Sequence, residues 1–195
     1  MSLVVDATLK VQSSAGAESV PKPAGSFVAI GLENPKTPDN VGSVLRAVGC
    51  FNAQAVYYSG QRYDIAAKHH TDTKNVQQRV NLARSESWHA LKVQLPEGTQ
   101  LVCVELALGA TSLPEFEHPE RALYVFGPED GSLPKAVVSA ADAVVYIPTI
   151  GCLNLAATVN VLLYDRLLKR GLSAEMKTGD ELILASRDNR NRLKV

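Results

Sequence analysis

The sequence predicts an α/β protein with a mostly parallel sheet flanked by helices. Short apolar segments rich in β-branched residues alternate along the chain with segments whose apolar residues recur at helical spacing. The first three elements, a strand at residues 26–32, a helix at 40–50 and a strand at 54–59, occupy about 35 residues, which is the length of a right-handed βαβ unit. Because such units run their strands in parallel, the alternation favours one sheet between helices.

The remaining elements follow in the same alternating order. The first helix has an apolar face made by Val41, Val44, Leu45 and Val48. Asp39 precedes that face and is the predicted N-cap of the helix. Further strands are predicted at residues 99–107, 122–127 and 143–147, and a short helix starts at Pro134, since proline fits a first helical turn.

The strand at residues 143–147 opens the longest uncharged run of the chain. The run covers residues 143–164, and its 22 residues could span a membrane on length alone. However, Pro148, Gly151 and Asn154 interrupt it, and the apolar residues that follow recur at helical spacing. We therefore predict a buried strand, a loop and a buried helix with Gly171 as its C-cap, and no membrane segment.

Length and composition indicate one domain. The chain has 195 residues, 46% of them apolar, which is enough for a sizeable core. We place this domain at residues 26–170. Residues 1–25 contain Ser, Ala, Gly and two prolines and are predicted as a loosely ordered lead-in, while residues 171–195 form a basic tail.

The cysteines and histidines favour a reducing compartment without a metal site. Cys50, Cys103 and Cys152 lie in apolar contexts without C-x-x-C spacing, so we expect neither disulfides nor zinc. The adjacent His69 and His70 would face different ways on a helix and have no third ligand nearby. No segment resembles a targeting sequence, so a cytoplasmic location is expected.

Charge is unevenly distributed along a chain whose formal net charge is zero. Residues 61–92 carry six Lys and Arg residues against three acids, and the tail from residue 169 carries seven against four. A basic connection of this kind is usually a solvated segment with one or two short helices. The alternative is a phosphate-binding surface for RNA, whose candidate contacts are Arg62, Lys68, Lys74 and Arg79.

Three polar loops follow predicted strands, which is where ligands bind parallel sheets. The first, ENPKTPDNVGSVLRA, contains Asn40, Gly42 and Arg46. The second, VFGPEDGSLP, contains Gly127, Glu129 and Gly131. The third, IPTIGCLNLAA, contains Ile147, Pro148, Cys152, Leu153 and Asn154. In this order, and each at a strand end, the three segments resemble the motifs of the SpoU/TrmH family of RNA ribose 2′-O-methyltransferases over residues 26–170.

The resemblance implies a fold and a cofactor that periodicity alone does not reveal. It implies a deep trefoil knot in the C-terminal part of the domain, with S-adenosylmethionine bound in the knot loops. By position, the cofactor-binding residues are Glu105, Leu106, Gly127, Ile147, Cys152 and Leu153. The glycine pattern of a standard dinucleotide fold is absent.

The resemblance also implies catalytic residues and partners. The reaction would transfer a methyl group to a ribose 2′-hydroxyl of RNA, with tRNA favoured over rRNA. Arg46 would orient the hydroxyl and its phosphate, since an arginine keeps its proton in neutral water and makes a poor base. Asn40, Glu129 and Asn154 would fix Arg46 and the loops by hydrogen bonds. Cys152 is the remaining catalytic candidate. A homodimer is expected, with the apolar helix at residues 154–168 as an interface.

One departure from the family pattern leaves a second hypothesis open. Cys152 stands where the family usually has serine, and a thiol is a weaker hydrogen-bond donor. The alternative function is therefore a knotted protein that binds RNA and S-adenosylmethionine but is catalytically weak or inactive. The neutral net charge of the chain also motivates this alternative.

Overall fold

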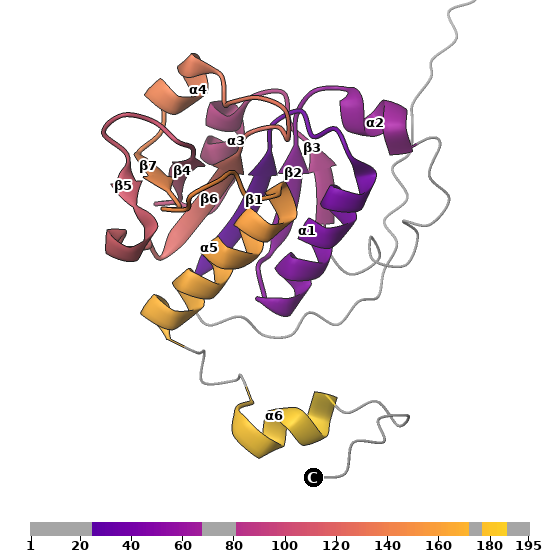
Figure 1. Ribbon diagram of the computed structural model, residues 1–195, viewed down its shortest axis with the longest axis vertical. Coiled ribbons are helices and arrows are strands. Elements are labelled where there is room, and N and C mark those ends of the chain that lie inside the picture. Colours follow the sequence, from indigo (N-terminus) through magenta and orange to yellow (C-terminus); the bar gives the residue numbers. More distant parts are fainter. Residues whose placement is uncertain (1–24, 68–80, 172–176, 187–195) are drawn as a thin grey trace, which may run out of the picture.

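A single parallel sheet forms the centre of the protein. The computed structural model describes residues 25–67, 81–171 and 177–186 (Figure 1). Its strands are β1 (Phe27–Leu32), β2 (Ala55–Tyr58), β3 (Asn81–Arg84), β4 (Gln100–Val104), β5 (Thr111–Ser112), β6 (Arg121–Phe126) and β7 (Ala143–Tyr146). Their order in the sheet is β3-β2-β1-β6-β4-β7-β5, and every pairing is parallel. This arrangement confirms the predicted fold class.

Helices lie on both faces of the sheet. They are α1 (Pro38–Cys50), α2 (Arg62–Ala67), α3 (Trp88–Gln94), α4 (Lys135–Ser139) and α5 (Leu155–Arg170), with a 3-10 turn η1 at Leu113–Glu115. A further helix, α6 (Gly179–Ser186), lies apart from the sheet (Figure 1) and its residues 179–185 are exposed. Helices α1 and α5 lie side by side over one face (Figure 1). The predicted βαβ unit is β1, α1 and β2. The predicted cap is wrong, because α1 begins at Pro38 with Thr37 at the N-cap position and Asp39 inside the first turn.

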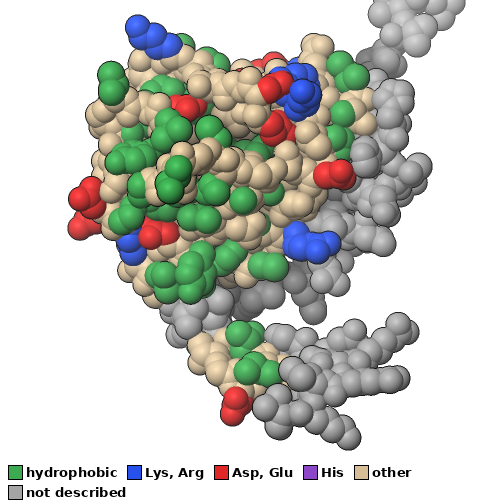
Figure 2. Space-filling model, viewed as in Figure 1, with side chains coloured by type: hydrophobic (Ala, Val, Ile, Leu, Met, Phe, Trp, Pro, Cys, Tyr) green, Lys and Arg blue, Asp and Glu red, His purple; other side chains and the backbone are tan. Residues whose placement is uncertain are grey.

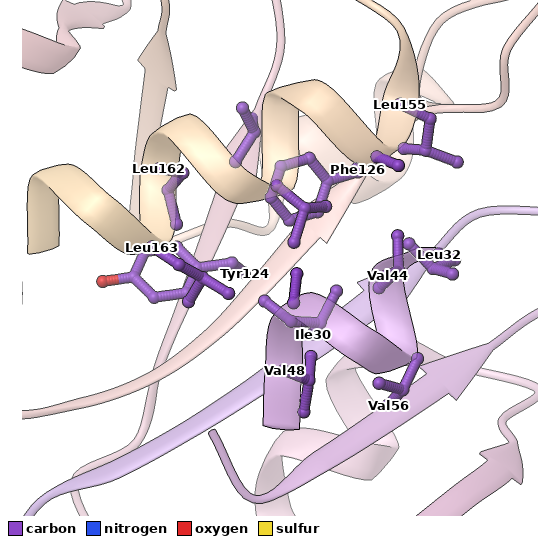
Figure 3. Packing of buried hydrophobic residues seen from close by; sticks show 14 of the residues in the cluster. Ile30, Leu32, Val44, Val48, Val56, Tyr124, Phe126, Leu155, Leu162 and Leu163 are labelled. Carbon is purple, nitrogen blue, oxygen red and sulfur yellow. The ribbon is translucent and has the colours of Figure 1, made fainter. Parts of the chain in front are cut away.

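The larger half of the core lies between the sheet and the pair α1 and α5 (Figure 3). Alternate residues of β1 point to this face, and Ile30 and Leu32 are fully buried there. Helix α1 contributes the predicted face, Val41, Val44, Leu45 and Val48, and all four side chains are buried. Fully burying an aliphatic side chain of this size stabilises a fold by about 1.5–3 kcal/mol. This layer therefore holds α1 in place against β1.

The opposite face of the sheet packs on α3 and α4. Trp88 of α3 is buried against this face, together with Leu123 and Val125 of β6. Gly31 of β1 permits the close approach, because a Cβ there would lie 2.8 Å from the Trp88 ring and 2.9 Å from Val125. The Trp88 indole Nε1 donates to Glu33 Oε2 at 2.6 Å, so this packing also holds the first residue after β1.

The uncharged run forms a strand, a loop and a helix, as predicted. Strand β7 ends at Tyr146, and α5 starts at Leu155 with Asn154 as its N-cap. The Asn154 side chain accepts hydrogen bonds from the backbone N–H groups of Ala156 at 2.9 Å and Ala157 at 3.3 Å. Gly171 follows the last residue of α5 with a φ of 78°. Within the described residues, no helix is long and apolar enough to span a membrane.

A buried polar cluster fastens the C-terminal half of α5 to the segment before β6. Arg166 donates to the carbonyl of Glu120 at 2.8 Å and to the Tyr124 hydroxyl at 3.0 Å. His118 lies 2.7 Å from that hydroxyl through Nδ1 and 2.9 Å from Asp165 through Nε2. Burial lowers the pKa of His118 despite its hydrogen bond to Asp165, and burial raises the pKa of Tyr124 to about 12. The cluster is therefore built around a neutral imidazole.

Candidate functional site

A cavity of about 580 Å³ opens where β4, β6 and β7 end, beside the start of α1. Its walls come from four segments that are far apart in the sequence. They include Lys36, Thr37 and Asn40; Val104, Glu105 and Leu106; Phe126, Gly127, Pro128, Glu129, Asp130 and Gly131; and Tyr146, Ile147, Thr149, Gly151, Cys152, Leu153, Asn154, Leu155 and Thr158. The carboxyl ends of parallel strands are where such sheets bind ligands, and the volume falls within the range of about 300–1,000 Å³ typical of ligand pockets.

The cavity brings together the predicted catalytic and cofactor-binding residues, with the exception of Arg46. The six residues predicted to bind a cofactor line it: Glu105, Leu106, Gly127, Ile147, Cys152 and Leu153. Asn40, Glu129 and Asn154 line it as well. Arg46 does not, because it lies on the exposed side of α1 and makes no hydrogen bond or ion pair with any described residue. The structure thus places the predicted supporting residues around one cavity and leaves Arg46 outside it.

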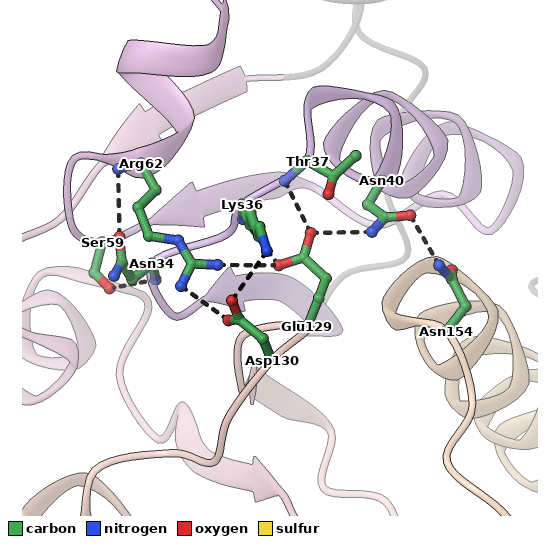
Figure 4. A network of polar contacts seen from close by, with 9 residues as sticks. All are labelled: Asn34, Lys36, Thr37, Asn40, Ser59, Arg62, Glu129, Asp130 and Asn154. Carbon is green, nitrogen blue, oxygen red and sulfur yellow. Dashed lines mark hydrogen bonds and ion pairs between the residues drawn. The ribbon is translucent and has the colours of Figure 1, made fainter.

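Glu129 joins the loop after β6 to the loop after β1 (Figure 4). Its carboxylate accepts hydrogen bonds from the backbone N–H groups of Lys36 at 2.8 Å and Thr37 at 3.0 Å, and from Asn40 Nδ2 at 3.0 Å. Partial burial raises the pKa of this carboxyl, but the hydrogen bonds from Asn40, Lys36 and Thr37 outweigh it, and the pKa falls below its ordinary value. Glu129 is thus an ionised acceptor that holds the start of α1.

Asn40 and Asn154 extend this connection to the third loop (Figure 4). Asn40 donates to Glu129 through Nδ2, and its Oδ1 accepts a hydrogen bond from Asn154 Nδ2 at 2.9 Å. Asn154 uses its own Oδ1 to cap α5. Each amide therefore has its oxygen and nitrogen fixed by different partners. One chain of hydrogen bonds connects the three predicted motif loops.

Glu105 closes the other side of the cavity. Its Oε1 accepts from the backbone N–H of Leu106 at 3.0 Å, and its Oε2 accepts from that of Leu133 at 2.7 Å. A Cβ at Gly127 would lie 3.3 Å from Glu105 Oε2. The absence of a side chain at Gly127 therefore lets the loop after β6 pack close to the end of β4.

A model of the SpoU rRNA Methylase family matches residues 28–164. The chain belongs to this family. The match covers every strand from β1 to β7 and most of α5, and it includes all four segments that line the cavity.

A curated protein and several solved structures resemble this SpoU family member. An uncharacterized tRNA/rRNA methyltransferase of Mycobacterium leprae is 26% identical over 148 residues, which cover 73% of this chain and 48% of that protein. The chain thus spans about half the length of this curated relative. Among solved structures, the SpoU methyltransferase AviRb from Streptomyces viridochromogenes, in complex with AdoMet, has a TM-score of 0.64 at 22% identity, covering 76% of this chain and 60% of that one.

Two further solved structures have similar folds. The A. aeolicus TrmH/SpoU tRNA modifying enzyme has a TM-score of 0.61 at 17% identity, covering 74% of this chain and 76% of that one. A structure that concerns 2-OH methylation of C/U34 on tRNA has a TM-score of 0.60 at 24% identity, covering 75% of this chain and 98% of that one. At these identities the likeness shows that the SpoU fold is shared.

Sequence reasoning missed Lys36 and Asp130 in this SpoU protein, and it assigned Arg62 to RNA, whereas the structure pairs Arg62 with Asp130. Asp130 Oδ2 lies 3.3 Å from Lys36 Nζ, and Asp130 Oδ1 accepts from Arg62 Nη1 at 2.9 Å. The hydrogen bond from Arg62 is the main cause that lowers the pKa of Asp130. The sequence PEDG, which follows a predicted strand, was the signal that could have drawn attention to Asp130.

Three of the predicted RNA contacts lie outside the described residues, as does the histidine pair at which no metal site was predicted. Lys68, Lys74 and Arg79 fall in the segment 68–80, outside the described residues, as do His69 and His70. Their predicted roles stay predictions. In the part of the chain that the structure describes, no group of three or more His, Cys, Asp and Glu residues could hold a metal ion.

A second hollow lies on the outer side of α5. It has a volume of about 560 Å³ and is lined mainly by apolar residues of α5, the end of α1 and the loops beside them. Its exposed members on α5 are Val161, Tyr164 and Leu168, which are 40%, 54% and 64% exposed. Figure 2 shows hydrophobic side chains with few charges over this face of the molecule.

Proposed function

We propose that this SpoU protein is an RNA methyltransferase that transfers a methyl group from S-adenosylmethionine to a ribose 2′-hydroxyl. The hydrogen-bond chain from Glu129 through Asn40 to Asn154 carries the proposal. It joins the three motif loops around one ligand-sized cavity at the carboxyl ends of the strands. Two of the similar structures support the same assignment, since one is a SpoU methyltransferase in complex with AdoMet and the other concerns 2-OH methylation of tRNA.

The cavity suits S-adenosylmethionine in charge as well as in size. Among the described residues, three acids, Glu105, Glu129 and Asp130, line it together with a single cation, Lys36. The cofactor carries a sulfonium, an ammonium and a carboxylate, so its net charge is positive and complements this lining. Apolar residues such as Leu106 and Leu153 offer surfaces for its adenine ring. When bound, the cofactor supplies the methyl group.

The protein's own residues would orient the ribose. Positioning of reacting groups can supply as much as about 7–11 kcal/mol of a barrier. Asn40, Glu129 and Asn154 would hold the loops so that the cavity keeps its shape. Arg46 lies outside the cavity with an exposed guanidinium, so the proposal assigns it to the RNA phosphate and hydroxyl beside the cavity entrance. Its positive charge would stabilise the oxygen as the hydroxyl proton passes to solvent water and the methyl group is transferred from the sulfonium.

Partners and topology complete the proposal. RNA is the substrate, with tRNA favoured over rRNA, and Lys68, Lys74 and Arg79 are proposed to contact the phosphates of the RNA backbone.

The apolar outer side of α5 is proposed as the interface of a homodimer. A deep trefoil knot is also proposed, on the resemblance of the three motif loops to those of the SpoU family. A cytoplasmic location fits the free thiols of the described cysteines.

Cys152 supports a second candidate function. It lines the cavity and is exposed at the position where the family usually has serine. A thiol donates weaker hydrogen bonds than a hydroxyl. The competing candidate is therefore a protein that binds S-adenosylmethionine and RNA with little or no turnover.

Transfer of labelled methyl from S-adenosylmethionine to RNA tests the proposal. Total tRNA and rRNA from cells that lack this protein would be incubated separately and analysed by nucleotide. We expect label in an alkali-resistant 2′-O-methyl dinucleotide from the tRNA pool. Loss of at least 100-fold, or about 2.7 kcal/mol, is expected for Arg46→Ala. Lys135→Ala on α4 serves as a control and should retain full activity, because Lys135 does not line the cavity.

Two results would redirect the assignment. Full activity of a folded Arg46→Ala variant would show that the catalytic centre is wrongly placed. Cofactor binding without label in either pool would favour the second candidate. In that case Cys152→Ser becomes the decisive variant, because a large gain in rate would identify the thiol as the cause of low turnover.

A further inference from the structure

Arg62 contacts two acids that line the cavity, but it belongs to none of the three motif loops. It is the first residue of α2, and its backbone N–H donates to Asn34 Oδ1 at 3.3 Å. Its guanidinium Nη1 donates to Asp130 at 2.9 Å, and Nη2 lies 3.9 Å from Glu129 Oε2 (Figure 4). Arg62 thus faces two consecutive acids of the loop after β6, both of which line the cavity.

The backbone next to Arg62 is held in place by close contacts between two loops. Asn34 adopts a left-handed conformation, with a φ of 40°, and its backbone N–H donates to Ser59 Oγ at 3.0 Å. Gly60 has a φ of 73°, and a Cβ there would lie 2.2 Å from Asn34 Oδ1. Only glycine fits such a close approach at this φ. The start of α2 is therefore held against the loop after β1, which fixes the direction from which Arg62 reaches the acids.

The Arg62 guanidinium forms ion pairs with both of these acids. Its side chain is only 33% exposed, and the Nε and Nη2 atoms are buried without a hydrogen-bond partner. Buried donors of a charged group destabilise a structure unless something nearby compensates. Here Asp130 and Glu129 supply that compensation. These contacts favour a role for Arg62 within the protein.

The ion pairs also have a geometric consequence. Lys36 approaches Asp130 from the loop after β1, and Arg62 approaches it from α2. Asp130 is therefore held from two sides, while its neighbour Glu129 is held by the backbone of that same first loop. Fixing both acids restricts the loop from Gly127 to Gly131, which forms one wall of the cavity.

We infer that Arg62 is a positioning residue for cofactor binding: through Asp130 and Glu129 it holds the loop that forms one wall of the S-adenosylmethionine cavity. The inference rests on the proposed function of that cavity. It assigns to Arg62 an effect on the affinity for S-adenosylmethionine and none on the contact with RNA.

Calorimetry with S-adenosylhomocysteine as the probe tests this role. Arg62→Met and Asp130→Asn should each weaken binding about three- to tenfold, and the double variant should be no weaker than the worse single variant, since both changes remove one interaction. Arg62→Lys should recover part of the affinity. The matched control is Arg84→Met, because Arg84 pairs with Asp64 and Glu86 away from the cavity and is similarly exposed, at 37%; it should bind as the wild type does.

Kinetics separate positioning from other roles. In Arg62→Met, the KM for S-adenosylmethionine should rise while kcat at saturating cofactor stays unchanged and the salt dependence of RNA binding keeps its slope. Unchanged affinity for the probe in Arg62→Met overturns the inference, as do additive losses in the double variant. A reduced salt slope with unchanged affinity would assign Arg62 to RNA instead. Failure of the wild type to bind the probe would contradict the proposed function itself, and Asp130→Asn carries the test if Arg62→Met fails to fold.

Discussion

Asn154 combines a structural and a functional hydrogen bond in one side chain. Its Oδ1 caps α5, and its Nδ2 donates to Asn40. Loss of an N-cap costs about 0.5–2 kcal/mol of stability. We therefore expect Asn154→Ala to lower the free energy of unfolding by about 1 kcal/mol in urea titrations, and to weaken binding of S-adenosylhomocysteine because the loops are no longer joined.

Asn154→Asp separates the two contributions. A carboxylate keeps the cap and suits the positive end of the α5 dipole, but it cannot donate to Asn40. The free energy of unfolding should stay within about 0.5 kcal/mol of the wild-type value, while cofactor affinity and methylation fall as in Asn154→Ala. If Asn154→Asp binds and methylates normally, the bond to Asn40 does not support the site.

The predictability of the site residues depends on whether their partners are local or remote. Asn40, Glu129 and Asn154 could be predicted because each lies in a recognisable segment after a strand. Arg62 could only be assigned to a basic stretch. Its partner Asp130 lies 68 positions away, and nothing in the local sequence indicates that the two meet. Arg46 was predicted from its motif, but its place relative to the cavity depends on the helix face that α1 buries.

The same reasoning applies at the scale of elements. Strands β1, β6 and β7 were predicted because they are apolar runs that lie next to other strands in the interior of the sheet. Strand β3, with the sequence NLAR, shows no such pattern, and it is a strand because its backbone pairs with β2 at the sheet edge. Helix α6 lies in the predicted basic tail, and its apolar residues Leu182, Ile183 and Leu184 are consecutive, which gives no helical period.

The attachment of α5 to the segment before β6 should depend on pH. Arg166 donates to the Tyr124 hydroxyl, so that hydroxyl can donate to His118 Nδ1 while Nε2–H donates to Asp165. A second proton on His118 would leave the buried hydroxyl facing two donors. Because the pKa of His118 is lowered in the fold, the unfolded chain binds more protons as pH falls below its ordinary value of 6.5. Stability is therefore complete above that pH and decreases below it.

Urea titrations at a series of pH values test this prediction. Between pH 7.5 and 5, the wild type should lose stability more steeply than His118→Gln, although the variant itself should be about 1–3 kcal/mol less stable at pH 7.5 because buried partners lose their hydrogen bonds. His89→Gln on α3 is the control, since His89 is exposed, and it should leave both the stability and the slope unchanged. Equal slopes in the wild type and His118→Gln would exclude His118 as the titrating group.

At the scale of the whole molecule, the two hollows lie on different sides of the loop that precedes α5. The first is lined by the acids and the motif loops, and the second by apolar residues of α5, with Ile147 shared by both. An exposed apolar face of this kind marks an association surface. If a second copy covers the outer side of α5, the same loop would be restrained from one side by the dimer and from the other by the cofactor. Dimer formation and cofactor affinity should then be coupled.

Light scattering after gel filtration checks the dimer and its link to the cavity. The mass of the wild type measured by light scattering should be twice the 20.9 kDa of one chain. Leu168→Glu, which puts a charge on the 64% exposed apolar face of α5, should weaken the dimer at least about tenfold and shift it toward 20.9 kDa. Val93→Glu is the matched control, because Val93 is 75% exposed on α3, which packs on the opposite face of the sheet. A monomeric wild type, or a Leu168→Glu variant that stays fully dimeric, would exclude this face as the interface. If monomeric Leu168→Glu binds the cofactor more weakly than the wild type does, the dimer supports the cavity.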